Sequence, residues 1–123
     1  MSAISSMMKT QVWSVGMDDT VHEVEEFMNS HGLSWVPVCE PGGAVVGVVS
    51  VADLLQFHVR RQDPAATRTW QVCTYKPISV APDTSVSEVA RLMLRNRSHH
   101  VVVMDQGRIV GVVSSLDFVR QLA

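Results

Sequence analysis

Two pairs of residues in this chain combine a hydroxyl group with a carboxylate at the same spacing. Ser50 is followed three residues later by Asp53, and Ser114 is followed three residues later by Asp117. A Ser-x-x-Asp pattern between a β-branched run and an apolar stretch is typical of a helix start. The serine caps the helix, and the aspartate lies in the first turn, where the helix dipole favours negative charge. One pair alone indicates a helix cap, whereas two pairs in register favour two similar pockets.

The two pairs belong to an internal duplication. Alignment of the chain with itself places Ser14-Val15 on Ser79-Val80, Glu23-Val24 on Glu88-Val89, and Met28 on Met93. After the turn at residues 41–43 the offset between the two copies shrinks by one position, so the second copy lacks one residue of that turn. A tight surface turn is where a duplicated unit best tolerates a deletion.

Each copy predicts the element order β-α-β-β-α. The extended pieces are Val12 to Val15 and Ile78 to Val80, and a helix then starts at each of the capping patterns Thr20-x-x-Glu23 and Ser85-x-x-Glu88. Gly32 suits the end of the first helix, and Asn96 is its weaker equivalent in the second copy. Two strands and a closing helix follow: 35–39, 45–50 and 52–60 in the first copy, and 100–104, 108–114 and 116–122 in the second.

The predicted fold is therefore of the α/β (α+β) class. Repeat 1 spans residues 1–62, the polar, proline-containing segment 63–67 is a linker, and repeat 2 spans residues 68–123. Repeats of this size are near the lower limit for independent folding. We expect the two sheets to pack face to face around a pseudo-twofold axis with the helices outside. This arrangement would leave a cleft near each Ser-x-x-Asp.

Composition excludes several classes of function. A net charge of −2 and the absence of a basic run argue against a nucleic-acid partner. No apolar run approaches the ~20 residues of a membrane span, and no secretory signal is visible at the start. Cys39 and Cys73 have no Cys-x-x-Cys spacing, which favours free thiols in a cytoplasmic protein.

The duplicated motifs make the chain resemble a tandem pair of CBS domains, also called a Bateman module. The matching features are the lead-in Met7-Met8-Lys9-Thr10, the helix start Asp19-Thr20-Val21, Val36-Pro37-Val38 before a turn, and the two Gly-x-x-Ser-x-x-Asp motifs. The resemblance covers nearly the whole chain. Val102 departs from it, because that residue stands where the first copy has Pro37.

The resemblance implies a regulatory module for adenosine-containing ligands such as AMP, ADP, ATP or S-adenosylmethionine, with no required cofactor. The aspartate would accept hydrogen bonds from the ribose hydroxyls, and the helix start would suit a phosphate. Each pocket would combine the aspartate of one repeat with residues of the other. Site 1 would hold Ser50, Asp53, Pro77, Ile78, Ser79, His99 and His100, and site 2 would hold Ser114, Asp117, Trp13, Ser14, Ser34 and Trp35.

The two pockets differ in the charge that the sequence predicts for them. His99 and His100 offer positive charge to a phosphate, whereas Ser34 and Trp35 offer none. We therefore expect site 1 to prefer phosphorylated adenosine and site 2 to bind more weakly or to take a less charged ligand. Packing in the core or at an interface is a simpler role for Trp13 and Trp35 than stacking on a base. No third ligand has the spacing that a metal site at the His pair requires.

Two functions of different classes remain open. The first is an adenosyl-ligand sensor that acts on an unknown partner protein, and the second is a ligand-free module for dimerisation or protein interaction. The resemblance implies a homodimer in both cases. Enzyme activity is not expected, because no nucleophile has a general base at a usable spacing.

Overall fold

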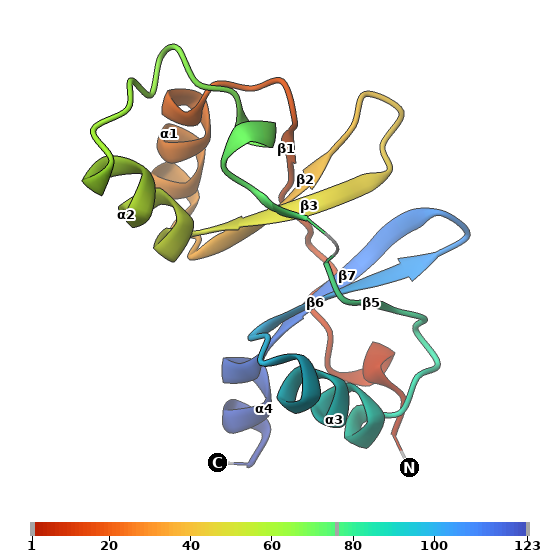
Figure 1. Cartoon of the computed structure of the whole chain (residues 1–123). Helices are drawn as coiled ribbons and strands as arrows, with labels where there is room; N and C mark the ends of the chain where they lie inside the picture. Colours follow the sequence, from red (N-terminus) through yellow and green to blue (C-terminus); the bar gives the residue numbers. More distant parts are fainter. Residues whose placement is uncertain (1, 76, 123) are drawn as a thin grey trace. The chain divides into compact units, whose positions relative to one another are not determined.

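The computed structural model describes residues 2–75 and 77–122 (Figure 1). The chain divides into two compact units, which we name by their helices. The α1–α2 unit contains residues 13–75, with helices α1 (Val21–His31) and α2 (Val51–Val59). The α3–α4 unit contains residues 2–12 together with residues 77–122, with helices α3 (Val86–Asn96) and α4 (Ser115–Leu122). The segment at the N-terminus therefore packs with the second repeat, although it precedes the first repeat in the sequence.

The α1–α2 unit is built on a four-stranded sheet with strand order β1-β2-β3-β4. Its strands β1 and β2 are parallel, and the other neighbours are antiparallel. The elements are β1 (Val15–Gly16), α1 (Val21–His31), β2 (Trp35–Cys39), β3 (Val45–Ser50), α2 (Val51–Val59), the short helix η2 (Thr69–Gln71) and β4 (Thr74–Tyr75).

The α3–α4 unit repeats this plan with a three-stranded sheet of order β5-β6-β7. Strands β5 and β6 are parallel, and β6 and β7 are antiparallel. The elements are the short helix η1 (Ile4–Ser6), β5 (Ser79–Val80), α3 (Val86–Asn96), β6 (His100–Asp105), β7 (Arg108–Ser114) and α4 (Ser115–Leu122).

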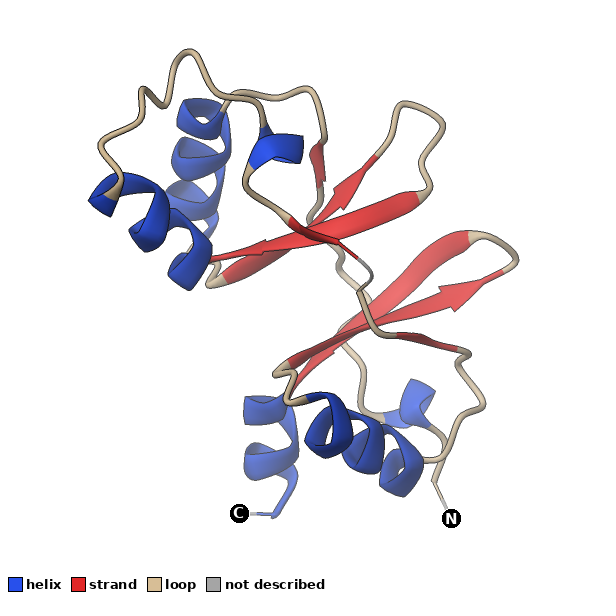
Figure 2. Cartoon of the chain, viewed as in Figure 1, coloured by secondary structure: helices blue, strands red, loops and turns tan. Residues whose placement is uncertain are grey.

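The predicted order β-α-β-β-α is confirmed in both units, and in each unit the helices lie on one side of the sheet (Figure 2). The first strand is shorter than predicted. Strand β1 contains only Val15–Gly16, where the sequence predicts an extended piece from Val12 to Val15. Both residues of β1 pair with β2, and residues 12–14 have no sheet partner to hold them in a strand.

The ends of the first helix in each unit follow from local chemistry. The Thr20 side chain accepts a hydrogen bond from the Glu23 N–H, and Gly32 ends α1 in the left-handed conformation. The prediction that Asn96 takes the capping position of Gly32 in the second copy is wrong. Asn96 is the last helical residue, and Arg97 takes the left-handed position at φ 51°. Arg97 aligns with Gly32 in the internal duplication, so the position of the cap is preserved although the residue there has changed.

The segment before each repeat packs on the other repeat. Lys9 forms an isolated antiparallel bridge with Val112 of β7, and Thr74 of β4 pairs with Val48 of β3. In the internal duplication Thr74 is the counterpart of Lys9, and Val112 is the counterpart of Val48. The two lead-in segments, residues 4–9 and 69–75, therefore occupy equivalent places.

Each unit has its own hydrophobic core. In the α1–α2 unit the fully buried side chains come from α1 and the two central strands, and in the α3–α4 unit Ile4 of η1 joins the buried residues of α3, β6 and β7. Thr69 is the counterpart of Ile4 in the other unit, where it is equally buried and donates its hydroxyl to the Asp19 carbonyl at 2.8 Å. Each lead-in thus anchors one helix–sheet core.

Candidate functional site

The first Ser-x-x-Asp lies where β3 ends and α2 begins. The Ser50 N–H and hydroxyl donate to Oδ2 of Asp53 at 2.9 Å and 3.0 Å, and the Asp53 N–H donates back to the Ser50 hydroxyl at 3.3 Å. One carboxylate oxygen is therefore used in capping α2. The other oxygen, Oδ1, has the Thr74 hydroxyl at the long distance of 3.4 Å. This leaves Oδ1 available to accept a stronger hydrogen bond.

The second Ser-x-x-Asp lies at the start of α4, where the serine N–H again bonds to the aspartate, and its outer oxygen has different partners. The Ser114 N–H donates to Oδ2 of Asp117 at 2.8 Å. Oδ1 lies 3.6 Å from Nζ of Lys9 and 4.0 Å from the Arg120 guanidinium. Asp117 is 8% exposed, so its charge is largely buried. Two cations therefore accompany the carboxylate at this site.

Thr74 and Lys9 are functional candidates that are missing from the residues predicted for sites 1 and 2. They occupy the same place in the two units, each against the outer oxygen of a motif aspartate. The signal that identifies them is the internal duplication, which continues upstream of Ser14 to these two polar positions.

The glycine of each motif makes room for the lead-in segment. A Cβ at Gly47 would lie 2.6 Å from the Thr74 carbonyl oxygen, and a Cβ at Gly111 would lie 2.4 Å from Sδ of Met8 and 3.1 Å from the Lys9 carbonyl. At Gly47 the lead-in backbone itself leaves no room for a side chain, whereas at Gly111 the closest atoms belong to the Met8 side chain.

Cys73 lies beside the first motif and has the properties of a structural thiol. Its Sγ is 3.1 Å from the Cβ position of Gly47. Burial raises the pKa of the Cys73 thiol, and the nearby Asp53 carboxylate raises it further. Burial also raises the pKa of Cys39. Both cysteines are free, as the sequence predicts.

His99 contacts the helix that carries Asp117. Its Nδ1 lies 3.3 Å from the Ser115 hydroxyl, and its carbonyl accepts a hydrogen bond from the Ser115 N–H at 2.9 Å. The Ser34 carbonyl accepts from the Val51 N–H at 3.0 Å in the same way at the start of α2. Ser34, before β2, and His99, before β6, thus each lie next to the Ser-x-x-Asp of their own repeat. The predicted sites 1 and 2 instead combine each of them with the aspartate of the other repeat.

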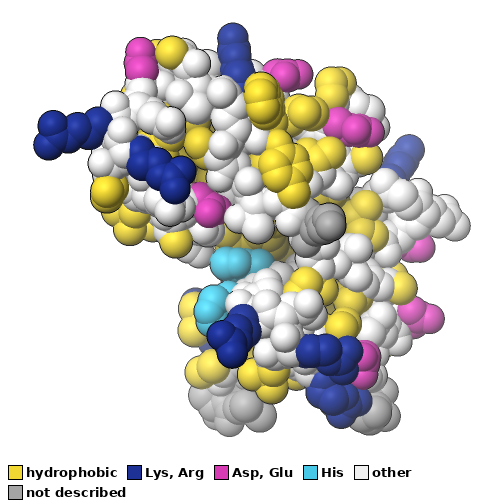
Figure 3. Space-filling model, in the orientation of Figure 1, with side chains coloured by type: hydrophobic (Ala, Val, Ile, Leu, Met, Phe, Trp, Pro, Cys, Tyr) yellow, Lys and Arg dark blue, Asp and Glu magenta, His cyan; other side chains and the backbone are white. Residues whose placement is uncertain are grey.

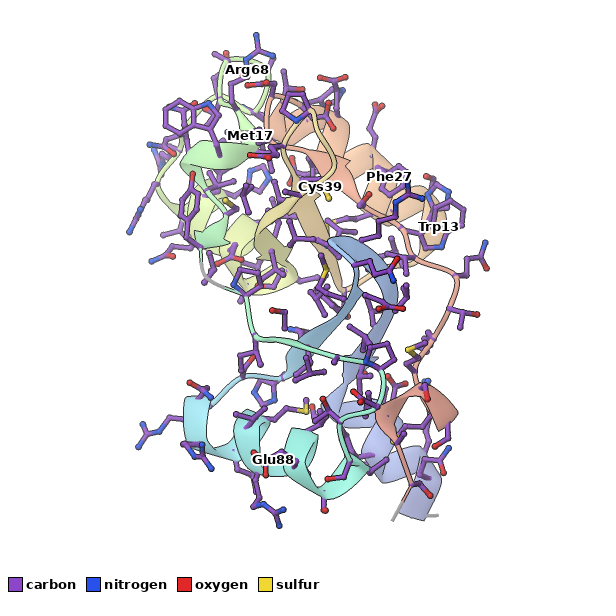
Figure 4. All side chains as sticks on the ribbon, turned by 90° about the vertical axis from the view of Figure 1, so that its right-hand side faces the viewer. Trp13, Met17, Phe27, Cys39, Arg68 and Glu88 are labelled. Atoms are coloured by element: carbon purple, nitrogen blue, oxygen red, sulfur yellow. The ribbon has the colours of Figure 1, made fainter. Side chains whose placement is uncertain are left out.

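Trp13 belongs to an aromatic cluster on α1. Its ring centroid lies 4.1 Å from that of His31 and 5.9 Å from that of Phe27, and the Trp13 and Phe27 side chains lie side by side at the edge of the unit (Figure 4). The His31 Nδ1 lies 2.9 Å from the Phe27 carbonyl oxygen, which fixes the imidazole at the end of the helix. Trp13 remains 36% exposed.

The other predicted site residues divide between the two units. Ser14 and Trp35 lie in the α1–α2 unit with Ser50 and Asp53. Pro77, Ile78, Ser79 and His100 lie in the α3–α4 unit with Ser114 and Asp117. Ser79 and Val80 form β5, while the Ile78 carbonyl accepts from the Val102 N–H at 2.9 Å. Each unit by itself brings together one motif with the first and middle strands of the same unit, so the mixed composition of the two pockets stays a prediction.

A groove within the α1–α2 unit opens beside Asp53. It has a volume of about 440 Å³, and its lining includes Asp53 and Phe57 of α2, Arg60, and Gln71 and Val72. Asp63 of the 63–67 segment also lines it. The motif carboxylate is therefore accessible from a concave surface of its own unit.

Residues 2–75 and 77–122 contain neither a metal-binding cluster nor a membrane-spanning helix. No group of three or more His, Cys, Asp or Glu side chains there is arranged to hold a metal ion. Likewise, no helix in these ranges has the length and hydropathy to cross a membrane.

The model of the CBS domain family matches residues 4–60 and 70–123. The chain therefore belongs to the CBS domain family, and its two repeats are two CBS domains. The resemblance predicted from the duplicated motifs is confirmed.

Three relatives illustrate the likeness. The CBS domain-containing protein YhcV of Bacillus subtilis is 25% identical over 114 residues, which cover 93% of this chain and 81% of YhcV. The mitochondrial CBS domain-containing protein CBSX3 of Arabidopsis thaliana is 32% identical over 84% of this chain, which spans about half (52%) of CBSX3. The structure of the CBS domain pair of protein MJ0100 with 5′-methylthioadenosine and S-adenosyl-L-methionine has a TM-score of 0.89 at 20% identity, covering 99% of this chain and 100% of that one. At this identity the likeness to MJ0100 shows the fold.

Proposed function

We propose that this CBS domain pair is a regulatory module that binds adenosine-containing ligands through Asp53 and Asp117 and acts on another protein. The observation that carries the proposal is the state of the two carboxylates. In each motif Oδ2 is held by the helix cap, while the contacts of Oδ1 with Thr74 or Lys9 are long. Two fixed carboxylates at equivalent places are typical of a ligand site that has been duplicated.

The chemistry of this arrangement suits a ribose. An oriented carboxylate oxygen accepts hydrogen bonds from the vicinal 2′- and 3′-hydroxyls, and such charge-assisted bonds are about twice as strong as neutral ones. The serine hydroxyl and the free N–H groups at the start of the helix suit a phosphate or another polar group next to the ribose. The MJ0100 complex, which contains methylthioadenosine and S-adenosylmethionine, supports adenosyl compounds as the ligand class.

The residue sets predicted for the two pockets form part of the proposal. Asp53 and Ser50 work with the first strand of the other repeat, Pro77, Ile78 and Ser79. Asp117 and Ser114 work with Trp13 and Ser14. His99, His100, Ser34 and Trp35 complete the sets as assigned from the resemblance.

The charge near each aspartate bears on the ligand preference. The sequence favours Asp53 as the phosphate-binding site because of the two histidines. Within the units, however, Lys9 and Arg120 lie within 4.0 Å of the Asp117 carboxylate, whereas the cation beside Asp53 is Arg60, which lines the same groove. We therefore propose that the Asp117 site also accepts phosphorylated adenosine, which a comparison of AMP with adenosine tests directly.

The proposal includes self-association and a cytoplasmic setting. Exposed hydrophobic side chains occur on the helices of both units, among them Leu55 and Val59 of α2 and Leu94 of α3. The second candidate function, a ligand-free interaction module, rests on these same side chains.

A thermal-shift panel separates the two functions. AMP, ADP, ATP, S-adenosylmethionine and methylthioadenosine are each added to the full chain. A ligand at about 100 times its dissociation constant adds about 2.7 kcal/mol of stability, which is a large shift for a chain of this size. We expect a shift with at least one adenosyl compound and none with guanosine or cytidine monophosphate. An unchanged melting temperature across the panel would favour the interaction module.

A further inference from the structure

The Asp117 carboxylate is a buried charge whose nearest cation comes from the lead-in segment. The Asp117 side chain is 9% exposed, and its outer oxygen Oδ1 lies 3.6 Å from Nζ of Lys9. The Arg120 guanidinium lies further away, at 4.0 Å. Because a buried charge without a partner is costly, the carboxylate depends on these two cations, and on Lys9 first.

The backbone of Lys9 is fixed, whereas its side chain extends into solvent. The Lys9 N–H donates to the Val112 carbonyl and the Val112 N–H donates to the Lys9 carbonyl, both at 3.0 Å, so the lead-in is held against β7. The Lys9 side chain is 58% exposed. Its ammonium lies at the end of a flexible four-carbon stem, so it can leave Oδ1 of Asp117 without any movement of the backbone.

The internal duplication places a neutral residue at both of these cationic positions in the α1–α2 unit. Thr74 is the counterpart of Lys9, and Gln56 is the counterpart of Arg120. The Thr74 hydroxyl lies 3.4 Å from Oδ1 of Asp53, and Gln56 lines the groove beside Asp53. The cap that holds Oδ2 is kept in both repeats, while the partners of Oδ1 have changed in charge.

Both aspartates nevertheless have a cation that a phosphate could reach. Arg60, which follows the last residue of α2, lines the groove beside Asp53. The difference between the two sites therefore lies in the partner of Oδ1, which is an ammonium at Asp117 and a hydroxyl at Asp53.

A ribose that bonds to Oδ1 of Asp117 competes with the Lys9 ammonium for that oxygen. A nucleoside without a phosphate offers the displaced ammonium no charged partner, and the loss of a cation from a buried carboxylate is costly. A phosphate on the same ligand gives the ammonium a new charge-assisted hydrogen bond, which offsets this cost. At Asp53 a ribose replaces a long contact with a hydroxyl, so no such cost arises.

We propose that Lys9 is a charge gate, a cation that must leave Oδ1 of Asp117 before a ligand binds there. The gate opens to phosphorylated adenosine and excludes adenosyl ligands that lack a phosphate. Thr74 at the equivalent place lets the Asp53 site accept both kinds of ligand. The inference rests on the proposed function and assigns the ligand specificity of its two sites.

Calorimetric titration of AMP and of adenosine into Asp53→Asn, which isolates the Asp117 site, tests the gate. We expect AMP to bind at least about tenfold more tightly than adenosine in this background. Adding Lys9→Thr, which copies Thr74, should tighten adenosine binding by about tenfold, whereas Lys9→Arg should not. Arg95→Gln is the control, because it removes an exposed cation of α3, over which Figure 3 shows Lys and Arg side chains at the surface.

The reciprocal change introduces the gate at the other site. In Asp117→Asn, which isolates the Asp53 site, we expect Thr74→Lys to weaken adenosine binding by about tenfold and to weaken AMP binding less. The melting temperature of each variant shows that it is folded. Lysine and threonine each occur at this place in one repeat, so neither exchange introduces a residue that the lead-in cannot hold.

The outcomes separate the gate from the proposed function. If Lys9→Thr weakens AMP binding and leaves adenosine binding unchanged, Lys9 is a phosphate contact only, and the gate is overturned while the proposed function stands. Equal affinities of AMP and adenosine in Asp53→Asn would overturn the gate in the same way. Failure of AMP to bind in both isolated sites and in the wild type would contradict the proposed function and the gate together.

Discussion

At the scale of single residues, the two motif glycines explain why the aspartates have polar neighbours from a distant part of the chain. Gly47 and Gly111 allow the lead-in backbone to cross directly over the strand that ends in the motif. Thr74 and Lys9 then reach Oδ1 of Asp53 and Asp117. The spacing Gly-x-x-Ser-x-x-Asp therefore combines a packing requirement with a cap and a carboxylate.

The two glycines differ in what an added methyl group would meet, and this gives a matched pair of variants. In Gly47→Ala the new Cβ meets the backbone oxygen of Thr74, which is fixed in β4. In Gly111→Ala the closest atoms belong to the flexible Met8 side chain, which can turn aside. We expect Gly47→Ala to cost about 1–3 kcal/mol and Gly111→Ala to cost less than about 1 kcal/mol in urea denaturation. A larger cost for Gly111→Ala would contradict this assignment of contacts.

Glu23 makes the stability of α1 depend on pH. Its carboxylate accepts hydrogen bonds from the N–H and the hydroxyl of Thr20, both at 3.0 Å, and these bonds lower the pKa of Glu23. Because the pKa is lowered by folding, the stabilisation is present above the pKa of the unfolded chain and is lost as the pH falls through the folded value.

The measurement is the melting temperature between roughly pH 6 and pH 3 for the wild type and Glu23→Gln. Glutamine keeps an acceptor for the cap but does not titrate in this range. We expect the wild type to lose more stability on acidification than the variant does. Parallel curves for the two proteins would show that this cap has no role in the acid response.

At the scale of elements, the exchange of lead-in segments links each repeat to the other. Ile4 is fully buried in the core of the α3–α4 unit, and Thr69 is fully buried in the α1–α2 unit. Ile4→Ala should cost about 2–5 kcal/mol, because it removes buried volume that the site cannot refill.

Hydrogen exchange locates this loss. In Ile4→Ala the amides of α3, β6 and β7 should exchange faster, while those of α1 and β2 change much less. The counterpart Thr69→Ala should show the opposite distribution, because the Thr69 hydroxyl bonds to the Asp19 carbonyl beside α1. Loss of protection in α1 with Ile4→Ala, equal to that in α3, would contradict the separation into two cores.

Most elements were predictable from the sequence because their signals are local. The capping threonine and serine mark the starts of α1 and α3, and the β-branched runs mark the central strands of both sheets. Strand β4 and the short helices η1 and η2 were not predicted. Strand β4 has two exposed residues without an alternating pattern, and its pairing with β3 depends on a contact far away in the sequence.

At the two motifs, the local geometry was predictable, whereas the composition of the pockets remains a prediction. The aspartates and their caps follow from the Ser-x-x-Asp spacing, and the structure confirms the hydrogen bonds. The roles of Lys9 and Thr74 and the contact of His99 with Ser115 depend on tertiary packing. The sequence around Lys9, Thr74 and His99 does not indicate which helix start each of them will contact. These contacts therefore could not be predicted from the sequence alone.

At the scale of the whole molecule, the duplication has two different outcomes. It has preserved the parts that hold the carboxylates, namely the motif, the cap and the lead-in segment. It has inverted the charge on one helix face, where Glu26 corresponds to Arg91. We infer that the ligand sites remain equivalent in design, while the outer surfaces of the first helices have diverged in charge.

The most direct test of the ligand sites is a calorimetric titration of AMP, with S-adenosylmethionine as a second ligand, into Asp53→Asn, Asp117→Asn and the double variant. Asparagine keeps an acceptor for the serine N–H of the cap, but its amide nitrogen cannot accept a hydrogen bond from a ribose hydroxyl. Asp83→Asn, in the turn before α3, is the matched control. We predict that each single variant loses one binding event, that the double variant loses all binding, and that the control equals the wild type. Unchanged binding in the folded double variant would contradict the assignment of Asp53 and Asp117 as the ligand sites.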